Sequence, residues 1–135
     1  MNKLFIISFF FALVTFIVLG GLFGNFVFLP EFETWHEAYP DAVRETPDFV
    51  SGFVLGLLQL IAFVVLLPKL QITSGSGAAL FGAVYSVVIW LIVDLQMVSV
   101  TNIVSYEYVL KDALLSAVMG AILGVVVSWS QRRFA

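Results

Sequence analysis

The segment SVVIWLIVDLQMVSV, residues 86–100, is apolar enough to cross a membrane but contains one charged residue, Asp94. A carboxylate at the centre of a bilayer costs about 2.5–3.5 kcal/mol on insertion scales, so such residues usually face the interior of a helix bundle or a water-filled path. Asp94 therefore needs a partner or a function, and it is the first candidate site.

The composition assigns the chain to the membrane proteins. Of its 135 residues, 61% are hydrophobic and 11% are charged, whereas soluble domains contain about 25% charged residues. A helix needs roughly 20 apolar residues to cross about 30 Å of hydrocarbon, which allows a single membrane domain of about four spans. The chain has no cysteine, which excludes disulfides, thiolate metal sites and thiol redox chemistry.

Four long apolar runs predict an all-α, four-helix membrane bundle that occupies residues 1–135 as one domain. The predicted helices cover residues 4–29, 49–67, 77–102 and 105–130. The first run is too long for a secretory signal core and is interpreted as an uncleaved span. Thr46 and Ser76 are the expected N-caps of the second and third helices.

The polar segment 30–47 joins the first two spans. Thr34 and Glu37 have the spacing of a capping box, so we expect a short interfacial helix from Trp35 to Tyr39, ended by Pro40. This helix would lie on the membrane surface, with its aromatic rings in the headgroup belt.

Small residues recur at four-residue spacing in all four predicted helices. This spacing predicts close approach of helix backbones in a membrane, where apolar surface alone does not drive helix association. The glycines expected at packing positions are Gly20, Gly24, Gly52, Gly56, Gly82, Gly120 and Gly124.

Basic residues near the helix ends predict the orientation. Lys3, Lys69, Arg132 and Arg133 fall on one side of the membrane, and Arg44 and Lys111 fall on the other. The positive-inside rule then places both termini in the cytoplasm and segment 30–47 outside. We expect the location to be a cell membrane, namely a bacterial inner membrane.

Three alternatives remain open for Asp94. It forms a structural bond, which is an ion pair with Lys111 or a hydrogen bond to Asn25 or Asn102; it is a binding or proton-coupling site; or it is exposed to water. For the second alternative, the polar side chains expected to take part are Asn25, Gln59, Gln96 and Lys111.

A metal site at the polar segment is a further hypothesis. Glu33 and His36 have the i, i+3 spacing of carboxylate-bridged metal sites in helix bundles, and Glu37 follows directly. Such sites need a second motif of the same kind, so a solvated surface segment is the simpler interpretation, and no cofactor is expected.

Three functions are compatible with the sequence. The first is a structural or accessory subunit that packs as a homo-oligomer or with a membrane protein partner in the lipid bilayer. The second is a small transporter or channel in which Asp94 is the coupling or binding carboxylate. The third is a membrane enzyme or cation-binding protein that uses the acidic loop; no catalytic constellation favours an enzyme, and no nucleic-acid partner is expected.

Overall fold

The computed structural model describes residues 3–135, which are helical apart from three connections. The elements are α1 (Lys3–Phe23), the π-helical turn η1 (Gly24–Phe28), α2 (Leu29–Ala38), α3 (Phe49–Lys69), α4 (Gly75–Val100) and α5 (Tyr106–Phe134). Four helical segments in this part of the chain are long and apolar enough to cross a membrane: Lys3–Ala38, Phe49–Lys69, Gly75–Val100 and Tyr106–Phe134. The prediction of an all-helical chain with four membrane-length helices is therefore confirmed.

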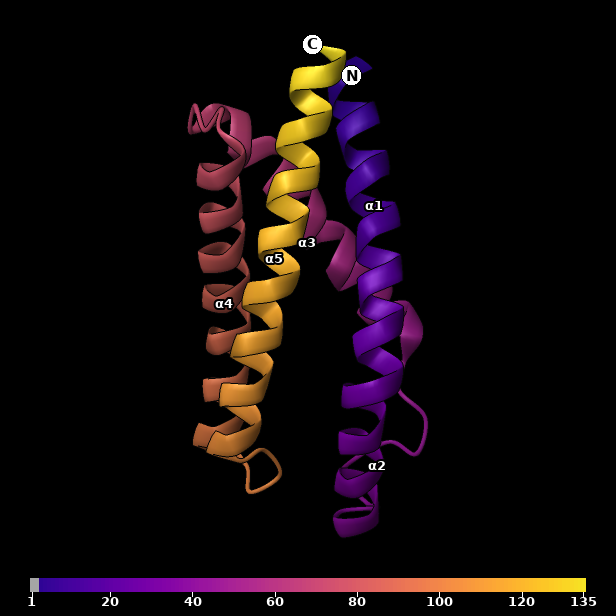
Figure 1. The fold of residues 1–135 in the computed structure, drawn as a ribbon. Coiled ribbons are helices and arrows are strands. Elements are labelled where there is room, and N and C mark those ends of the chain that lie inside the picture. Colours follow the sequence, from indigo (N-terminus) through magenta and orange to yellow (C-terminus); the bar gives the residue numbers. More distant parts are fainter. Residues whose placement is uncertain (1–2) are drawn as a thin grey trace.

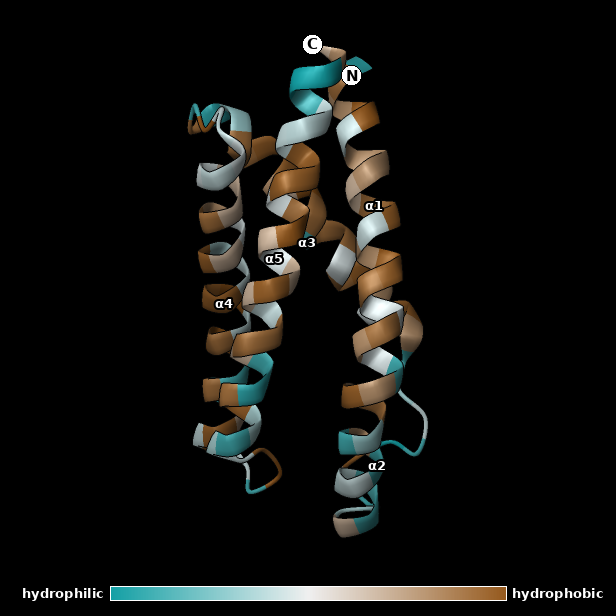
Figure 2. Cartoon of the chain, viewed as in Figure 1, coloured by the Kyte–Doolittle hydropathy of each residue, from teal (hydrophilic) through white to brown (hydrophobic). Residues whose placement is uncertain are grey.

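The helices pack around α5 (Figure 1). Helix α4 runs antiparallel to α5 along nearly its whole length, α1 packs against α5 from the other side, and α3 packs against α1. Both termini lie at one end of the bundle, called here the terminal end, and α2 and the connection 101–105 lie at the opposite end, the loop end. Polar residues gather toward both ends, and the middle of each helix is mainly apolar (Figure 2).

The first helix does not end where the sequence predicted. It continues through η1 and α2 to Ala38, so the expected short interfacial helix with a Thr34 cap is wrong. Thr34 lies inside α2, and its hydroxyl donates to the carbonyl oxygen of Pro30 at 3.0 Å. Pro30 is tolerated because it lies in the first turn of α2, and the preceding π-helical turn shifts the hydrogen bonds so that the Leu29 N–H reaches Gly24.

The other helices begin at side-chain caps. Asp48, not the expected Thr46, caps α3 by accepting from the Val50 and Ser51 N–H groups at 3.1 and 3.3 Å. Ser74, not Ser76, caps α4, and its hydroxyl oxygen accepts from the Gly77 N–H at 3.0 Å. Ser105 caps α5. In each case, the cap satisfies an N–H group that the first helical turn leaves without a partner.

Helices α4 and α5 touch through their backbones. A Cβ added at Gly82 would lie 2.0 Å from the Gly120 carbonyl oxygen, and a Cβ added at Gly124 would lie 2.0 Å from that of Ala78. No side chain fits at these positions, which is the close approach that small-residue spacing predicts.

The remaining predicted packing glycines differ among themselves. A Cβ at Gly56 would meet the Phe16 ring at 2.5 Å, and one at Gly20 would meet only the end of Met119 at 4.0 Å. At Gly24 and Gly52 an added Cβ has no neighbour within 4 Å. Packing within the described chain therefore does not require glycine at these last two positions.

Two apolar clusters fill the interior. The larger lies toward the terminal end and contains Leu60, Phe63, Val64, Leu67, Leu123 and Val127 with Ala12 and Ala78. The smaller lies at the loop end and contains Val104, Tyr108 and Val109. Buried polar side chains of α4 and α5 lie between them, and they form the candidate site.

Candidate functional site: a buried carboxyl pair between α4 and α5

Asp94 and Asp112 are buried opposite one another in the α4–α5 hairpin. Asp94 lies less than two turns before the end of α4 and is 6% exposed, and Asp112 lies about two turns into α5 and is 4% exposed. Because the two helices are antiparallel and are joined by the short connection 101–105, these positions are nearly level. Each carboxyl group therefore faces the neighbouring helix and not lipid.

The helical repeat explains why both acids face inward. The buried residues of α4 are Ala78, Gly82, Ser86 and Asp94, and those at four-residue steps along α5 begin with Asp112, Ser116, Gly120 and Gly124. Residues four apart lie on one face of a helix. The carboxyl groups therefore continue the same two stripes of small residues that bring the backbones into contact.

The two carboxyl groups are near enough to influence one another electrostatically. Asp112 Oδ1 also accepts a hydrogen bond from the Ser116 hydroxyl at 3.2 Å, whereas Asp94 Oδ2 is buried and has no hydrogen-bond partner among the described residues. An ionised carboxylate only accepts hydrogen bonds, so a bond between two carboxyl groups requires that one of them carries a proton.

No basic side chain neutralises this pair. Across residues 3–135 the one ion pair joins Lys111 to Glu31 of α2. The expected ion pair between Asp94 and Lys111 is therefore wrong. Lys111 lies next to Asp112 in the sequence but points from α5 toward α2, because successive residues of a helix face directions about 100° apart.

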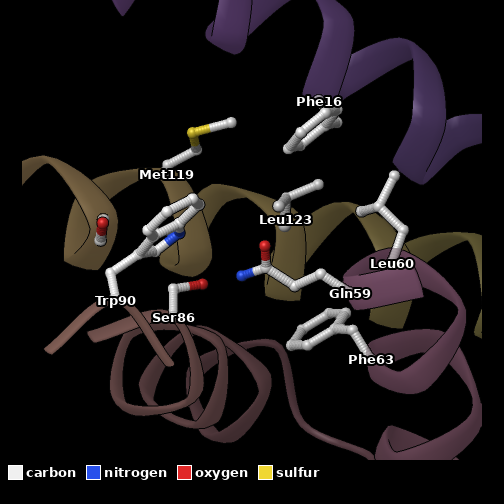
Figure 3. Close-up of a pocket in the computed structure, with 9 residues that line it drawn as sticks. Phe16, Gln59, Leu60, Phe63, Ser86, Trp90, Met119 and Leu123 are labelled. Atoms are coloured by element: carbon white, nitrogen blue, oxygen red, sulfur yellow. The ribbon is translucent and has the colours of Figure 1, made fainter. Parts of the chain in front are cut away.

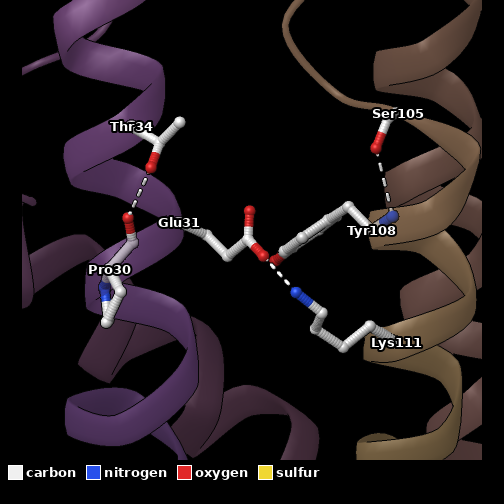
Figure 4. A network of polar contacts seen from close by, with 6 residues as sticks. All are labelled: Pro30, Glu31, Thr34, Ser105, Tyr108 and Lys111. Atoms are coloured by element: carbon white, nitrogen blue, oxygen red, sulfur yellow. Dashed lines mark hydrogen bonds and ion pairs between the residues drawn. The ribbon is translucent and has the colours of Figure 1, made fainter.

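Aromatic side chains close the pair on its loop side. Tyr108 lies one turn before Asp112 and is 7% exposed. Its hydroxyl interacts electrostatically with both acids. Its ring packs edge-on against Trp35 of α2, with centroids 4.7 Å apart, and against Phe28 of η1 at 6.4 Å. Figure 4 shows Tyr108 and Lys111 of α5 pointing toward Glu31 of α2. The ring contact between Tyr108 and Trp35 and the ion pair between Lys111 and Glu31 therefore join α2 to α5 next to the acids.

A small cavity lies about one helical turn from the pair, on the side away from Tyr108. Figure 3 shows the residues that line it. Its volume is about 30 Å³, and Ser116 of α5 and Trp90 of α4, each one turn from an acid, contribute to its wall. Figure 3 shows the Gln59 amide of α3 pointing toward Ser86 and the Trp90 ring. The rest of the wall is apolar and consists of Phe16, Leu60, Phe63, Met119 and Leu123.

The structure separates the other candidate polar residues. Gln59 lines the cavity, but Gln96 and Asn25 are exposed. The Asn25 amide donates to the Gly21 carbonyl oxygen of its own helix at 2.7 Å, not to a neighbouring helix. Asn25 and Gln96 are therefore not brought to Asp94.

The hypothetical metal ligands do not form a cluster. Glu33 and Glu37 are exposed, and His36 Nδ1 donates to the Val43 carbonyl oxygen at 2.8 Å. Within the described chain no group of three or more His, Asp and Glu side chains could hold a metal ion. His36 instead ties the connection after α2 back onto that helix.

Asp112 is the residue that sequence reasoning missed. It stands two four-residue steps before Gly120, one of the glycines expected at packing positions, with Ser116 between them. Extending the four-residue spacing from Gly120 by these two steps would have placed its carboxyl group in the helix interface.

Comparison with known proteins adds no relative. No protein-family model matches the chain, and searches of curated proteins and of solved structures find no match. The interpretation of the carboxyl pair therefore rests on its own geometry.

Proposed function

We propose that this chain is a small proton-coupled transport protein of a cell membrane and that Asp94 and Asp112 form its proton-binding pair. The observation that carries the proposal is the buried Asp94 Oδ2 atom, which has no hydrogen-bond partner and faces a second buried carboxyl group. Like charges this close cannot both ionise readily in a buried site, so two such groups share a proton.

A purely structural role accounts poorly for two acids at this position. Ionisable residues inside a membrane are expensive, and they typically mark proton relays or ion paths. An asparagine facing an aspartate would supply the same hydrogen bond at all times, without the need for a proton. The two aspartates attract one another only when a proton is present, which makes this part of the α4–α5 interface responsive to proton binding.

The chemistry that follows is a two-state cycle. With one proton the pair carries a single shared charge and a hydrogen bond, and the backbones of α4 and α5 remain in contact. Loss of that proton leaves two facing carboxylates, which repel one another and favour water or a cation between the helices. Proton binding is thereby linked to opening of the site, which is the requirement for coupled transport.

Proton flux in liposomes tests this function. The purified chain is reconstituted, a pH gradient is imposed, and internal pH is followed with a trapped dye for wild type, Asp94→Asn and Asp112→Asn. Glu107→Gln is the matched control, because Glu107 is an exposed acid in the first turn of the same helix as Asp112. We expect flux in wild type and the control and its loss in both pair variants; equal flux in all four proteins, or none in wild type, would overturn the proposal.

A structural or accessory subunit is the second candidate, and one face of α3 favours it. The first half of α3 exposes Phe49, Val50 and Phe53 around Gly52, where a Cβ would meet nothing. Small residues at an open, apolar helix face permit close approach of another helix. Since the chain has no cysteine, Gly52→Cys gives a single reporter thiol, and disulfide-linked dimers formed in native membranes would support self-association through α3.

A further inference from the structure

We infer that the cavity beside the carboxyl pair is a water-binding site and that its water exchanges protons with Asp112 through the Ser116 hydroxyl. This inference deepens the proposed function and rests on it for the role of the water, although the presence of water can be tested separately.

The size of the cavity fits water. A water molecule needs about 10–15 Å³ of accessible volume, so a cavity of about 30 Å³ has room for about two. A larger ligand does not fit without movement of the surrounding helices. The walls are contributed by α1, α3, α4 and α5, so the cavity lies between these four helices, and it is partly open to the surroundings of the bundle.

The polar lining also fits water. Within residues 3–135, the Gln59 amide and the Ser86 hydroxyl form no side-chain hydrogen bond; Gln59 is half-buried, and Ser86 is 7% exposed. A buried polar group without a partner is costly, and in the apolar interior of a membrane bundle an ordered water is the ordinary way to satisfy it. A buried water typically makes two to four hydrogen bonds, and Gln59, Ser86 and Ser116 together supply donors and acceptors of that kind.

Ser116 connects this water to the acids. Its hydroxyl donates to Asp112 Oδ1 at 3.2 Å, Ser116 is also one of the residues that line the cavity, and a hydroxyl oxygen can accept from water while it donates. A proton that arrives in the cavity as hydronium passes to Ser116 Oγ while the hydroxyl proton of Ser116 moves to Asp112 Oδ1. The hydronium is left as water, and the pair has gained one proton.

The surroundings favour this route over the alternatives. On the loop side, Tyr108 covers the acids, with Glu31 of α2 and Lys111 of α5 paired to each other beyond it. On the terminal side, the cavity is bounded by Leu60, Phe63 and Leu123 of the larger apolar cluster. In this conformation, Ser116 is therefore the hydrogen-bonding connection between the acids and the space that can hold water.

Two measurements test the inference. The first is NMR magnetisation transfer from water to the side-chain amide protons of Gln59, with the exposed Gln96 as the reference for free exchange with solvent or headgroups. In wild type we expect magnetisation transfer from a bound water to the Gln59 amide protons. In Leu123→Phe we expect this transfer to be lost, because the larger side chain fills the cavity from its apolar wall. Absence of transfer to Gln59 in wild type would overturn the water site.

The second measurement is the proton flux of Ser116→Ala, Ser116→Thr and, as a control, Ser99→Ala on the exposed face of α4. We expect Ser116→Ala to lower flux on the order of tenfold, because a positioned proton-transfer group is lost, and Ser116→Thr to restore most of it by keeping a hydroxyl. Unchanged flux in Ser116→Ala, with flux still lost in Asp94→Asn, would overturn the relay and leave the proposed function standing. No flux in wild type together with transfer to Gln59 would overturn the proposed function and its relay but keep the water site.

Discussion

Gly82 and Gly120 bring the backbones of α4 and α5 into direct contact. A Cβ added at either glycine would lie about 2 Å from the carbonyl oxygen of the other, 2.0 Å at Gly82 and 2.1 Å at Gly120. The contact lies three turns from Asp94 and two from Asp112, so it fixes how close the two acids stand.

Enlarging either glycine is expected to separate the helices. Gly82→Leu or Gly120→Leu should destabilise the fold by about 3 kcal/mol, because the new side chain has no space and keeps the backbones apart. Thermal unfolding in mild detergent measures the effect. Gly52→Leu is the control, since a Cβ there meets nothing within 4 Å; equal melting temperatures for the three variants and wild type would contradict the packing described.

The ion pair of Lys111 is expected to couple to Glu31 and not to Asp94. A double-mutant cycle with Glu31→Gln and Lys111→Met should give a coupling energy of about 0.5 kcal/mol. This value is modest because the Glu31 side chain is 25% exposed and the Lys111 side chain is 41% exposed. The coupling energy from the cycle with Asp94→Asn and Lys111→Met should lie within about 0.3 kcal/mol of zero. The reverse order of the two coupling energies would restore the ion pair expected from sequence.

The Asp48 cap is expected to show a specific pH dependence. Hydrogen bonds from Ser51, chiefly from its hydroxyl, lower the pKa of Asp48 from its ordinary value of 3.8. A lowered folded-state pKa means that the ionised cap stabilises the protein above that ordinary value, and that this contribution is lost as the pH falls through the folded-state pKa. Asp48→Ala should therefore lower the melting temperature at neutral pH and have little effect in strong acid, whereas Asp41→Ala, an exposed acid in the preceding turn, should change little at either pH.

Both termini are expected to lie in the cytoplasm. The structure places Lys3, where the described chain begins, at the same end of the bundle as Arg132 and Arg133 near the C-terminus. Reporter fusions at Ala135 and near Asp41 should then read cytoplasmic and external, respectively. The opposite readings would mean that the basic residues do not orient this chain, and that Tyr108 faces the cytoplasm.

The four spans could be predicted because long apolar runs with short polar connections admit few other folds. The continuation of the first helix past Pro30 could not be predicted from the sequence. A π-helical turn does not change the hydropathy pattern, and a proline usually indicates the end of a helix. The outward-facing Gly52 could not be told from the buried Gly82 for a related reason, since lipid and protein interior are equally apolar.

The site was half predicted. Asp94 stood out because it is a lone charge in an apolar run, and Gln59, one of the polar residues expected to take part in a site with Asp94, lines the cavity. The expected partners of Asp94 were Lys111, Asn25 and Asn102, since a carboxylate attracts a cation and accepts from an amide, whereas the structure places a second acid, Asp112, opposite it. The direction of Lys111 depends on a helix, α2, whose position was not evident from the sequence.

The protonation state of the pair at neutral pH tests the central claim most directly. Infrared spectroscopy of the protein in lipid distinguishes the carbonyl stretch of a protonated carboxylic acid from the bands of ionised carboxylates. We expect the protonated-acid band in wild type and in Glu107→Gln, and its weakening in Asp94→Asn, because an amide can donate to Asp112 without a proton having to be bound. A wild-type spectrum with ionised carboxylates alone, or a protonated-acid band as strong in Asp94→Asn and Asp112→Asn as in wild type, would contradict a shared proton between Asp94 and Asp112.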